Sequence, residues 1–175
     1  VARTCYIYTL SLHDALPISW TVFIDGKEGT TGLRIFDRLA ERGEFSLLTL
    51  PEEKRKDADA RREAIHAADI AILCLPDAAA RESVALAEGS NTRILDTSTA
   101  HRVAPGWAYG FPELSKKHRD AVVSGQYVAV PGCHASGFIA LAAPLVAAGL
   151  IPADTLLSCF SLTGYSGGGK KMIAE

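Results

Sequence analysis

Residues 21–32 read TVFIDGKEGTTG, and this stretch decides the fold. The mostly apolar, β-branched residues 21–25 predict a buried strand, and the glycine-rich residues 26–31 predict a turn. Residues 33–42 place their leucines and phenylalanine on one face, which predicts a helix that Gly43 ends. A strand, a glycine turn and a helix in this order form the first unit of a dinucleotide-binding fold.

The glycines of the turn are Gly26, Gly29 and Gly32. Their spacing is G-x-x-G-x-x-G, whereas the commoner motif is G-x-G-x-x-G. Glycines at these positions would let the backbone approach a pyrophosphate at the N-terminus of the following helix. The alternative is a glycine-rich turn that binds no ligand.

Strands and helices alternate outward from this unit. Further strands are predicted at residues 45–50, 70–75, 93–96 and 127–130, and further helices at residues 58–68, 78–88, 115–123 and 138–149. We therefore predict an α/β fold with a doubly wound, parallel, Rossmann-like sheet in a dinucleotide-binding domain at residues 20–150. A weakly alternating strand at residues 155–162 would belong to a second, α+β domain at residues 151–175.

Residues 51–57, PEEKRKD, follow the second strand, where such folds select their cofactor. An acid at this distance from the glycines would hold a ribose 2′-hydroxyl, and a base would hold the 2′-phosphate of NADP. Glu52 could serve the first role, and Lys54, Arg55 or Lys56 the second. The three adjacent bases favour NADP, and the alternative is a solvated loop whose charges balance one another.

Polar side chains follow the fourth predicted strand at the edge where ligands bind. Ser98 would lie near a nicotinamide, and Arg102 offers a planar fork suited to a phosphate or a carboxylate. Alternatively, Ser98 caps a turn and Arg102 pairs with an acid such as Glu113. His101 resembles a general base more than any other residue, and we favour a structural or substrate-orienting role for it.

Residues 130–137, VPGCHASG, place Cys133 between a predicted strand and a predicted helix. In the first turn of a helix, unpaired N–H groups and the helix dipole favour a thiolate, which is the nucleophilic form. The alternative is a small buried cysteine at a helix start. His134 points about 100° away along the helix and is poorly placed to take its proton. The aromatic loop at residues 105–114 is predicted to pack over the sheet edge and to shield the thiol from water.

Composition favours a protein that binds small molecules. The net charge is −2, so no broad basic face indicates nucleic acid or an anionic membrane, and no apolar run approaches the roughly 20 residues of a membrane-spanning helix. Cys5, Cys74 and Cys159 form no C-x-x-C pair with one another or with Cys133, which suggests neither a disulfide framework nor a zinc site. A reducing cytosol fits best, with Cys74 and Cys159 in protein cores.

Residues 1–19 do not continue this pattern. They begin without Met, and no predicted element leads them into the domain. A signal peptide is one alternative, but His13 and Asp14 interrupt its apolar stretch. Residues 11–19 also look like a translated sequencing adapter, so we expect a non-native or disordered extension with no fold of its own.

Six stretches of the chain resemble one enzyme family in sequence and in order. They are DGKEGTTG at 25–32, AILCLP at 71–76, DTSTAHRV at 96–103, YGFPEL at 109–114, PGC at 131–133 and GYSGGGK at 164–170. Together they make residues 20–175 similar to N-acetyl-gamma-glutamyl-phosphate reductase, the NADP-dependent family of arginine biosynthesis, in its shorter sequence type.

The resemblance implies NADPH-dependent reduction of N-acetyl-L-glutamyl 5-phosphate to N-acetyl-L-glutamate 5-semialdehyde through a thioester on Cys133. It also implies that Thr30 and Thr31 donate hydrogen bonds to cofactor phosphates and that the turn at Pro76 runs beside the cofactor. Residues 151–175 would open the substrate and dimerisation domain. The full-length protein would be a cytoplasmic homo-oligomer whose general-base histidine lies outside this chain.

By the same resemblance, the second glycine loop closes over the cofactor and the substrate. Gly167 and Gly168 would contact the cofactor, while Lys170 would contact the acyl phosphate together with Arg102 and His101. Aspartate-semialdehyde dehydrogenase, which shares this chemistry and architecture, is the nearest alternative enzyme. A chain that binds a dinucleotide without catalysis is the other alternative, because the base and the partner interface would be missing. A thiol hydrolase, whose activity would not depend on a nicotinamide, is a third alternative. The glycine turn at residues 26–32 argues against it.

Overall fold

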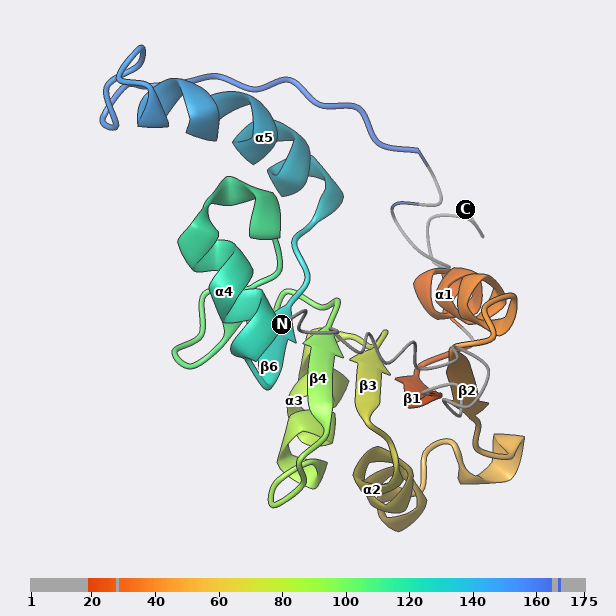
Figure 1. The fold of residues 1–175 in the computed structure, drawn as a ribbon. Helices are drawn as coiled ribbons and strands as arrows, with labels where there is room; N and C mark the ends of the chain where they lie inside the picture. The colour runs from red at the N-terminus through yellow and green to blue at the C-terminus, as the bar shows by residue number, and fades with distance from the viewer. Residues whose placement is uncertain (1–18, 28, 165–166, 168–175) are drawn as a thin grey trace, which may run out of the picture.

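Six strands form one sheet in the computed structural model, which describes residues 19–27, 29–164 and 167 (Figure 1). They are β1 (Trp20–Asp25), β2 (Phe45–Leu48), β3 (Ile70–Leu73), β4 (Arg93–Asp96), β5 (Ala108–Tyr109) and β6 (Tyr127–Ala129). The order across the sheet is β2-β1-β3-β4-β6-β5, and each neighbouring pair is parallel. The predicted α/β fold with a parallel sheet is confirmed.

The α-helices are α1 (Thr30–Ala40), α2 (Ala58–Ala67), α3 (Asp77–Leu86), α4 (Lys116–Ser124) and α5 (Cys133–Ala147), with short 3₁₀ turns η1 (Glu52–Lys54) and η2 (Pro112–Leu114). Each of the five α-helices overlaps a helix that the sequence pattern predicts, whereas the two 3₁₀ turns lie in predicted loops. The largest shift is at α5, which begins at Cys133 and not at Phe138. Gly132 is its N-cap, with extended backbone at φ −76° and ψ 153°, so the helix starts directly after the predicted break.

Helices cover both faces of the sheet. Side chains of β1 alternate, so Val22 and Ile24 pack with the apolar face of α1, while Phe23 points to the opposite side. There it joins Ile65 of α2 and Leu86 of α3 in the larger core cluster. In Figure 1, α1 lies above β1 and β2, and α2 lies below them.

A buried ion pair fastens the carboxyl end of β1 to the helices of one face. Arg61 of α2 donates from Nε and Nη2 to Asp25 Oδ2, at 3.1 Å each, and Ser83 of α3 donates to the same oxygen at 2.7 Å. These three residues are at most 5% exposed. Arg61 also pairs with Glu82 through Nη1 at 2.9 Å. The charge of Asp25 is therefore compensated inside the protein, as a buried carboxylate requires.

The predicted strand at residues 155–162 is wrong. This described segment forms no strand, and its Leu156 and Phe160 are 98% and 90% exposed. An isolated strand has no neighbour to bind its backbone N–H and C=O groups, so alternation alone does not make one. Cys159 lies in the same segment and is exposed, which contradicts its predicted place in a core.

The aromatic loop contains a strand that its sequence pattern does not predict. Within residues 105–114, Ala108 and Tyr109 pair with Val128 and Ala129 of β6 and so form the edge strand β5. Trp107 stands beside it, and its ring lies 5.2 Å from that of Tyr127. The loop thus packs over the sheet edge as predicted, but it also extends the sheet.

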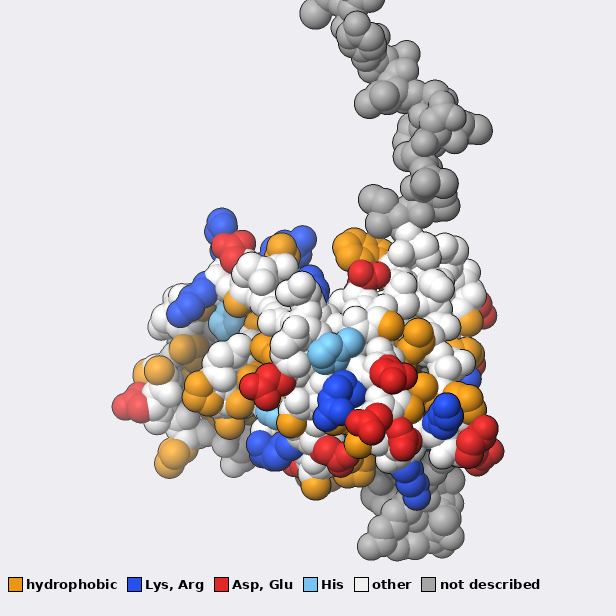
Figure 2. Space-filling view, turned by 90° about the horizontal axis from the view of Figure 1, so that it is seen from below, with side chains coloured by type: hydrophobic (Ala, Val, Ile, Leu, Met, Phe, Trp, Pro, Cys, Tyr) orange, Lys and Arg blue, Asp and Glu red, His pale blue; other side chains and the backbone are white. Residues whose placement is uncertain are grey.

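Charges are mixed on the face of the molecule that Figure 2 shows. Acidic and basic side chains are interspersed there with hydrophobic ones, and neither sign covers the face. Within the described ranges, no helix combines the length and the apolar character that crossing a bilayer requires.

Arg61→Met tests the buried ion pair. It leaves the Asp25 carboxylate buried without its counter-charge, so the free energy of unfolding should fall by about 3 kcal/mol or more. Arg62→Met is the matched control, because Arg62 is the next residue on α2 and makes an exposed pair with Asp59 at 2.7 Å. That pair should contribute less than about 1 kcal/mol. Urea unfolding followed by circular dichroism measures both, and similar losses would contradict this role of the pair.

Candidate functional site

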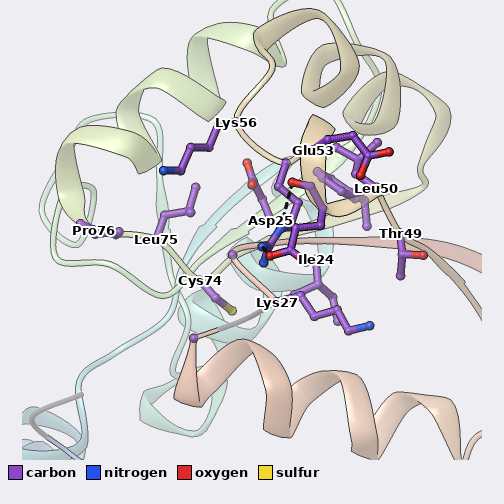
Figure 3. A pocket seen from close by; sticks show the side chains of 15 residues that line it. Ile24, Asp25, Lys27, Thr49, Leu50, Glu53, Lys56, Cys74, Leu75 and Pro76 are labelled. Carbon is purple, nitrogen blue, oxygen red and sulfur yellow. Dashed lines mark hydrogen bonds and ion pairs between the residues drawn. The ribbon is translucent and has the colours of Figure 1, made fainter. Parts of the chain in front are cut away.

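A pocket of about 530 Å³ opens at the carboxyl ends of β1, β2 and β3 (Figure 3). Its lining comes from the glycine turn, from the loop after β2 and from residues 74–76 after β3. β1 pairs with β2 on one side and with β3 on the other. The chain therefore runs from β1 to one side of the sheet and then crosses back over β1 to the other side. Open parallel sheets bind ligands at such a switch point.

The glycine turn is held by close backbone contacts. Gly26 has φ +84°, and a Cβ there would lie 2.4 Å from the carbonyl oxygen of Cys74. A Cβ on Gly32 would lie 2.4 Å from the carbonyl oxygen of Gly26. Gly29 is the N-cap of α1 and offers no side chain to the first N–H groups of the helix. These groups therefore remain able to bind an anion, and Gly26 and Gly29 line the pocket beside them.

Thr30 and Thr31 form the beginning of α1, next to the pocket but not among its lining residues. Their hydrogen bonds to phosphate stay predictions. Pro76 lines the pocket as the N-cap of α3. Lys27 also lines the pocket, which the sequence pattern does not predict. Its ammonium lies 3.6 Å from the centre of the Phe36 ring.

The loop after β2 presents both signs of charge to the pocket. Arg55 and Lys56 line it, together with Glu52 and Glu53, whereas Lys54 does not. Arg55 Nη2 donates to Glu52 Oε1 at 2.7 Å. Figure 3 shows the Lys56 side chain beside Leu75, on the far side of the pocket from Glu53. Of the three predicted bases, the structure brings Arg55 and Lys56 to the pocket, and Lys54 does not line it.

Cys74 is half-buried and also lines the pocket, although the sequence predicts only core packing for it. Burial raises the pKa of its thiol to about 11, against a lowering contribution from a hydrogen bond with Thr97. The negative charges of Asp25 and Asp96 raise this pKa further. Cys74 is therefore a neutral thiol near pH 7 and a weak nucleophile.

A buried carboxylate organises the turn after β4. Asp96 is 0% exposed and accepts hydrogen bonds from Ser98 N at 2.9 Å, from Ser98 Oγ at 2.7 Å and from His101 Nδ1 at 2.6 Å. The His101 ring stacks on Trp107, with centroids 4.2 Å apart. Ser98 and His101 are 8% and 6% exposed. Their described contacts build the turn, and their contacts with cofactor or substrate stay predictions.

Arg102 joins the loops that follow β4 and β6. Its Nε donates to the carbonyl of Val130 at 3.1 Å, and its Nη2 donates to the carbonyl of Thr97 at 3.2 Å. A Cβ on Gly132 would lie 2.7 Å from Nη1, so the guanidinium packs against the residue before Cys133. In the described chain these hydrogen bonds take the place of the alternative pair with Glu113.

The start of α3 is tied to the same turn. Asp77 accepts hydrogen bonds from Thr99 N at 3.0 Å and from Thr99 Oγ1 at 2.5 Å. These bonds, helped by the nearby charges of Arg81 and Arg102, hold the pKa of Asp77 below its usual range. The loops after β3, β4 and β6 therefore form a connected edge that runs from the pocket to Cys133.

Cys133 is the first residue of α5, and its thiol is exposed. The N-cap Gly132 makes no side-chain hydrogen bond to the helix, so its first N–H groups are open beside the sulfur. The next residue, His134, is predicted to be poorly placed to take a proton from Cys133, and its Nδ1 forms a hydrogen bond with Ser161 Oγ. The predicted position of Cys133 is confirmed, and its role as a nucleophile stays a prediction.

The second glycine loop is described only in part. Gly167 donates its backbone N–H to the carbonyl of Gly164 at 2.9 Å, a contact within the loop itself. Gly168 and Lys170, which are predicted to bind cofactor and substrate, lie outside the described residues. In the part of the chain that the structure describes, no group of three or more His, Cys, Asp or Glu side chains could hold a metal ion.

Comparisons with known proteins bear on this site. The family model "Semialdehyde dehydrogenase, NAD binding domain" matches residues 21–122, which include the glycine turn and the pocket. N-acetyl-gamma-glutamyl-phosphate reductases of Chelativorans sp. (strain BNC1) and Brucella anthropi are each 56% identical, over 154 and 155 residues. The alignments cover 88% of this chain and 50% of each relative. The chain thus spans about half the length of the curated relatives it matches.

Solved structures of aspartate semialdehyde dehydrogenases share the fold. The Vibrio cholerae enzyme II complexed with ASA matches with a TM-score of 0.56 and 16% identity, over 74% of this chain and 47% of that one. The Candida albicans enzyme with NADP matches with a TM-score of 0.54 and 17% identity, over 73% of this chain and 47% of that one. At such identities the likeness concerns the fold alone.

Iodoacetamide should modify Cys133 well before Cys74. Cys133 is exposed, whereas the Cys74 thiol has a pKa raised to about 11 and forms little thiolate at lower pH. After brief labelling at about pH 8, peptide mass spectrometry should find the adduct on Cys133 and on the exposed Cys159 but scarcely on Cys74. Labelling of Cys74 should rise as the pH approaches 11. The unfolded chain is the control, because there all cysteines should react alike, and equal labelling of the folded chain would contradict this ranking.

Proposed function

This chain belongs to the semialdehyde dehydrogenase family, as its NAD-binding domain, and on that premise we propose that the whole protein is an N-acetyl-gamma-glutamyl-phosphate reductase. It would reduce N-acetyl-L-glutamyl 5-phosphate to N-acetyl-L-glutamate 5-semialdehyde with NADPH. The observation that carries this proposal is the 56% identity to such reductases over 88% of the chain. Aspartate-semialdehyde dehydrogenase is supported only by the fold.

The pocket at the switch point would hold the cofactor. Gly26, Gly29 and Gly32 let the backbone approach a pyrophosphate, which the open N–H groups at the start of α1 and the hydroxyls of Thr30 and Thr31 would bind. Pro76 would border the cofactor, with Ser98 on its nicotinamide side and Gly167 and Gly168 in the loop above it. When bound, NADPH supplies the hydride of the reaction.

Cations in the loop after β2 favour NADP over NAD. Arg55 and Lys56 line the pocket, and either side chain can bind the 2′-phosphate. Arg55 already pairs with Glu52, so its position is fixed by that contact. Lys56 brings a second positive charge from the same loop. We therefore assign the 2′-phosphate to Arg55 and Lys56, and not to Lys54.

Cys133 would supply the covalent chemistry. Its thiolate forms a bond to the acyl carbon as the bond from that carbon to the phosphate oxygen breaks, which releases phosphate and leaves a thioester. Reduction of the thioester gives a thiohemiacetal, and breakage of its C–S bond releases the aldehyde and restores the thiolate. Splitting the reaction in this way replaces one difficult step by two easier ones.

Arg102 is the described residue best placed to bind the substrate phosphate. Two of its hydrogen bonds go to carbonyl groups, and a guanidinium has about five N–H donors, so several remain for a ligand. It packs against Gly132, directly before the thiol. His101 would orient the turn behind Arg102, and Lys170 would complete the substrate site. Residues from 151 onward would begin the substrate and dimerisation domain of a cytoplasmic homo-oligomer.

Cys133→Ser in the full-length protein tests the mechanism. Phosphate-dependent reduction of NADP with N-acetylglutamate semialdehyde should fall by at least roughly 10³-fold, because the nucleophile is lost. The dissociation constant of NADP should stay within about threefold, since the pocket is untouched. Cys159→Ser, at another exposed cysteine, should keep wild-type turnover.

Retained turnover in Cys133→Ser would remove this residue from the mechanism. Wild-type activity with aspartate semialdehyde alone would replace the substrate and keep the chemistry. Binding of NADP without turnover of either aldehyde would favour a protein that only binds the dinucleotide.

Lys56→Ala tests the choice of cofactor. Loss of a charge-assisted contact with the 2′-phosphate should weaken NADP binding about tenfold or more and leave NAD binding almost unchanged. Lys54→Ala is the matched control, because Lys54 belongs to the same loop and does not line the pocket. Titration of each variant with NADP and NAD measures the effect. A larger loss in Lys54→Ala than in Lys56→Ala would contradict the assignment.

A further inference from the structure

Asp25 is an acidic residue in the pocket, and the binding of phosphates by the basic residues does not explain its presence there. It is the last residue of β1, it is 4% exposed, and it lines the pocket directly before Gly26. Its Oδ2 accepts hydrogen bonds from Arg61 and Ser83, which fixes the plane of the carboxylate. Figure 3 shows its carboxylate among the side chains that border the pocket.

The other oxygen, Oδ1, has no hydrogen-bond donor among the described residues. None of the fully buried side-chain oxygens in the described ranges lacks a partner, so Oδ1 must retain accessible surface. The open space that Asp25 borders is the pocket. A carboxylate oxygen so enclosed and so directed favours a ligand that brings an O–H or N–H donor.

The neighbouring cations do not fill this role. Lys27 lies over the Phe36 ring, and Arg55 pairs with Glu52. A ligand for this pocket therefore needs anionic groups for the helix N-terminus and the bases, and also one donor for Asp25. A phosphorylated adenosine meets both requirements, because its ribose carries hydroxyls between its phosphates.

We propose that Asp25 Oδ1 accepts a hydrogen bond from the 3′-hydroxyl of the adenosine ribose, an inference that rests on the proposed NADP cofactor. In NADP the 5′ oxygen of this ribose belongs to the pyrophosphate and the 2′ oxygen carries the phosphate, so its only free hydroxyl is at the 3′ position. Asp25 directly precedes the glycine turn and lines the same pocket as Arg55 and Lys56. The ribose joins the pyrophosphate, which the glycine turn would bind, to the 2′-phosphate, which Arg55 and Lys56 would bind, so it would lie in the part of the pocket that these groups share with Asp25.

The pair of Asp25 with Arg61 would make this contact selective. Arg61 orients the carboxylate through its ion pair with Oδ2, which leaves Oδ1 as the acceptor toward the pocket. A ribose without the 3′-hydroxyl would leave a buried acceptor without a donor, which is costly. A 3′-phosphate would meet a negative charge at close range.

Two nucleotides and two variants test the proposal on the chain of residues 1–175. The probes are adenosine 2′,5′-bisphosphate and its 3′-deoxy analogue, titrated by calorimetry. The wild-type chain should bind the deoxy analogue at least about tenfold more weakly. Asp25→Ala should reduce this difference to less than about threefold, because the variant has no side-chain group to pair with the 3′-hydroxyl. Ser83→Ala is the control: it removes a donor to Oδ2 and leaves Oδ1, so the tenfold difference should remain.

Equal affinity of the wild-type chain for the two probes would overturn the role of Asp25 and leave the cofactor proposal intact. A tenfold difference that persists in Asp25→Ala would overturn it as well. No binding of adenosine 2′,5′-bisphosphate or of NADP would overturn the proposed cofactor and this inference with it. Thermal unfolding of each variant establishes that it is folded. If Asp25→Ala does not fold, the wild-type and Ser83→Ala chains still decide through the deoxy analogue.

Discussion

The close approach of Gly26 to the carbonyl of Cys74 is the constraint on which the candidate site depends. At 2.4 Å from that oxygen there is no room for a Cβ, and the φ of +84° is a conformation that side chains disfavour. Only glycine lets the exit of β1 lie against the exit of β3. A Cβ on Gly32 would likewise lie 2.4 Å from the carbonyl oxygen of Gly26. A glycine is therefore also required in the first turn of α1. The pocket is bordered by the exits of β1 and β3 and by the loop after β2.

Buried and half-buried polar groups hold the rest of this edge in place. Asp25 is tied to Arg61, Asp96 is tied to Ser98 and His101, and Arg102 spans two loops through their carbonyls. Each of these groups would be costly to bury alone, and each has its partner from a different segment or turn. The loops that carry the candidate chemistry are therefore positioned by satisfied polar contacts more than by apolar packing. Such pre-organisation suits the proposed function, in which the thiol of Cys133 would act beside a cofactor.

Local patterns in the sequence predict where strands and helices lie better than they predict which strands pair with one another. Strand starts at 45, 70, 93 and 127 follow from runs of apolar residues, and the start of α5 follows from the break at Gly132. The edge strand β5 has two residues, too few for any periodicity, and it exists because β6 offers it an unpaired edge. Residues 155–162 show the reverse case, since they alternate but have no neighbouring strand among the described residues. Pairing is a tertiary event that periodicity does not encode.

The sequence is also a limited guide to which charged side chains line the pocket. Its loop contains three adjacent bases in sequence, yet only Arg55 and Lys56 line the cavity, and Lys54, the last residue of η1, does not. The lining holds the cations Lys27, Arg55 and Lys56 and the anions Asp25, Glu52 and Glu53, so the formal charges cancel. Net charge therefore cannot explain a preference for a phosphorylated ligand. Selectivity must come from where each charge is fixed, and at Asp25 that position is set by Arg61, a residue 36 positions away in the chain.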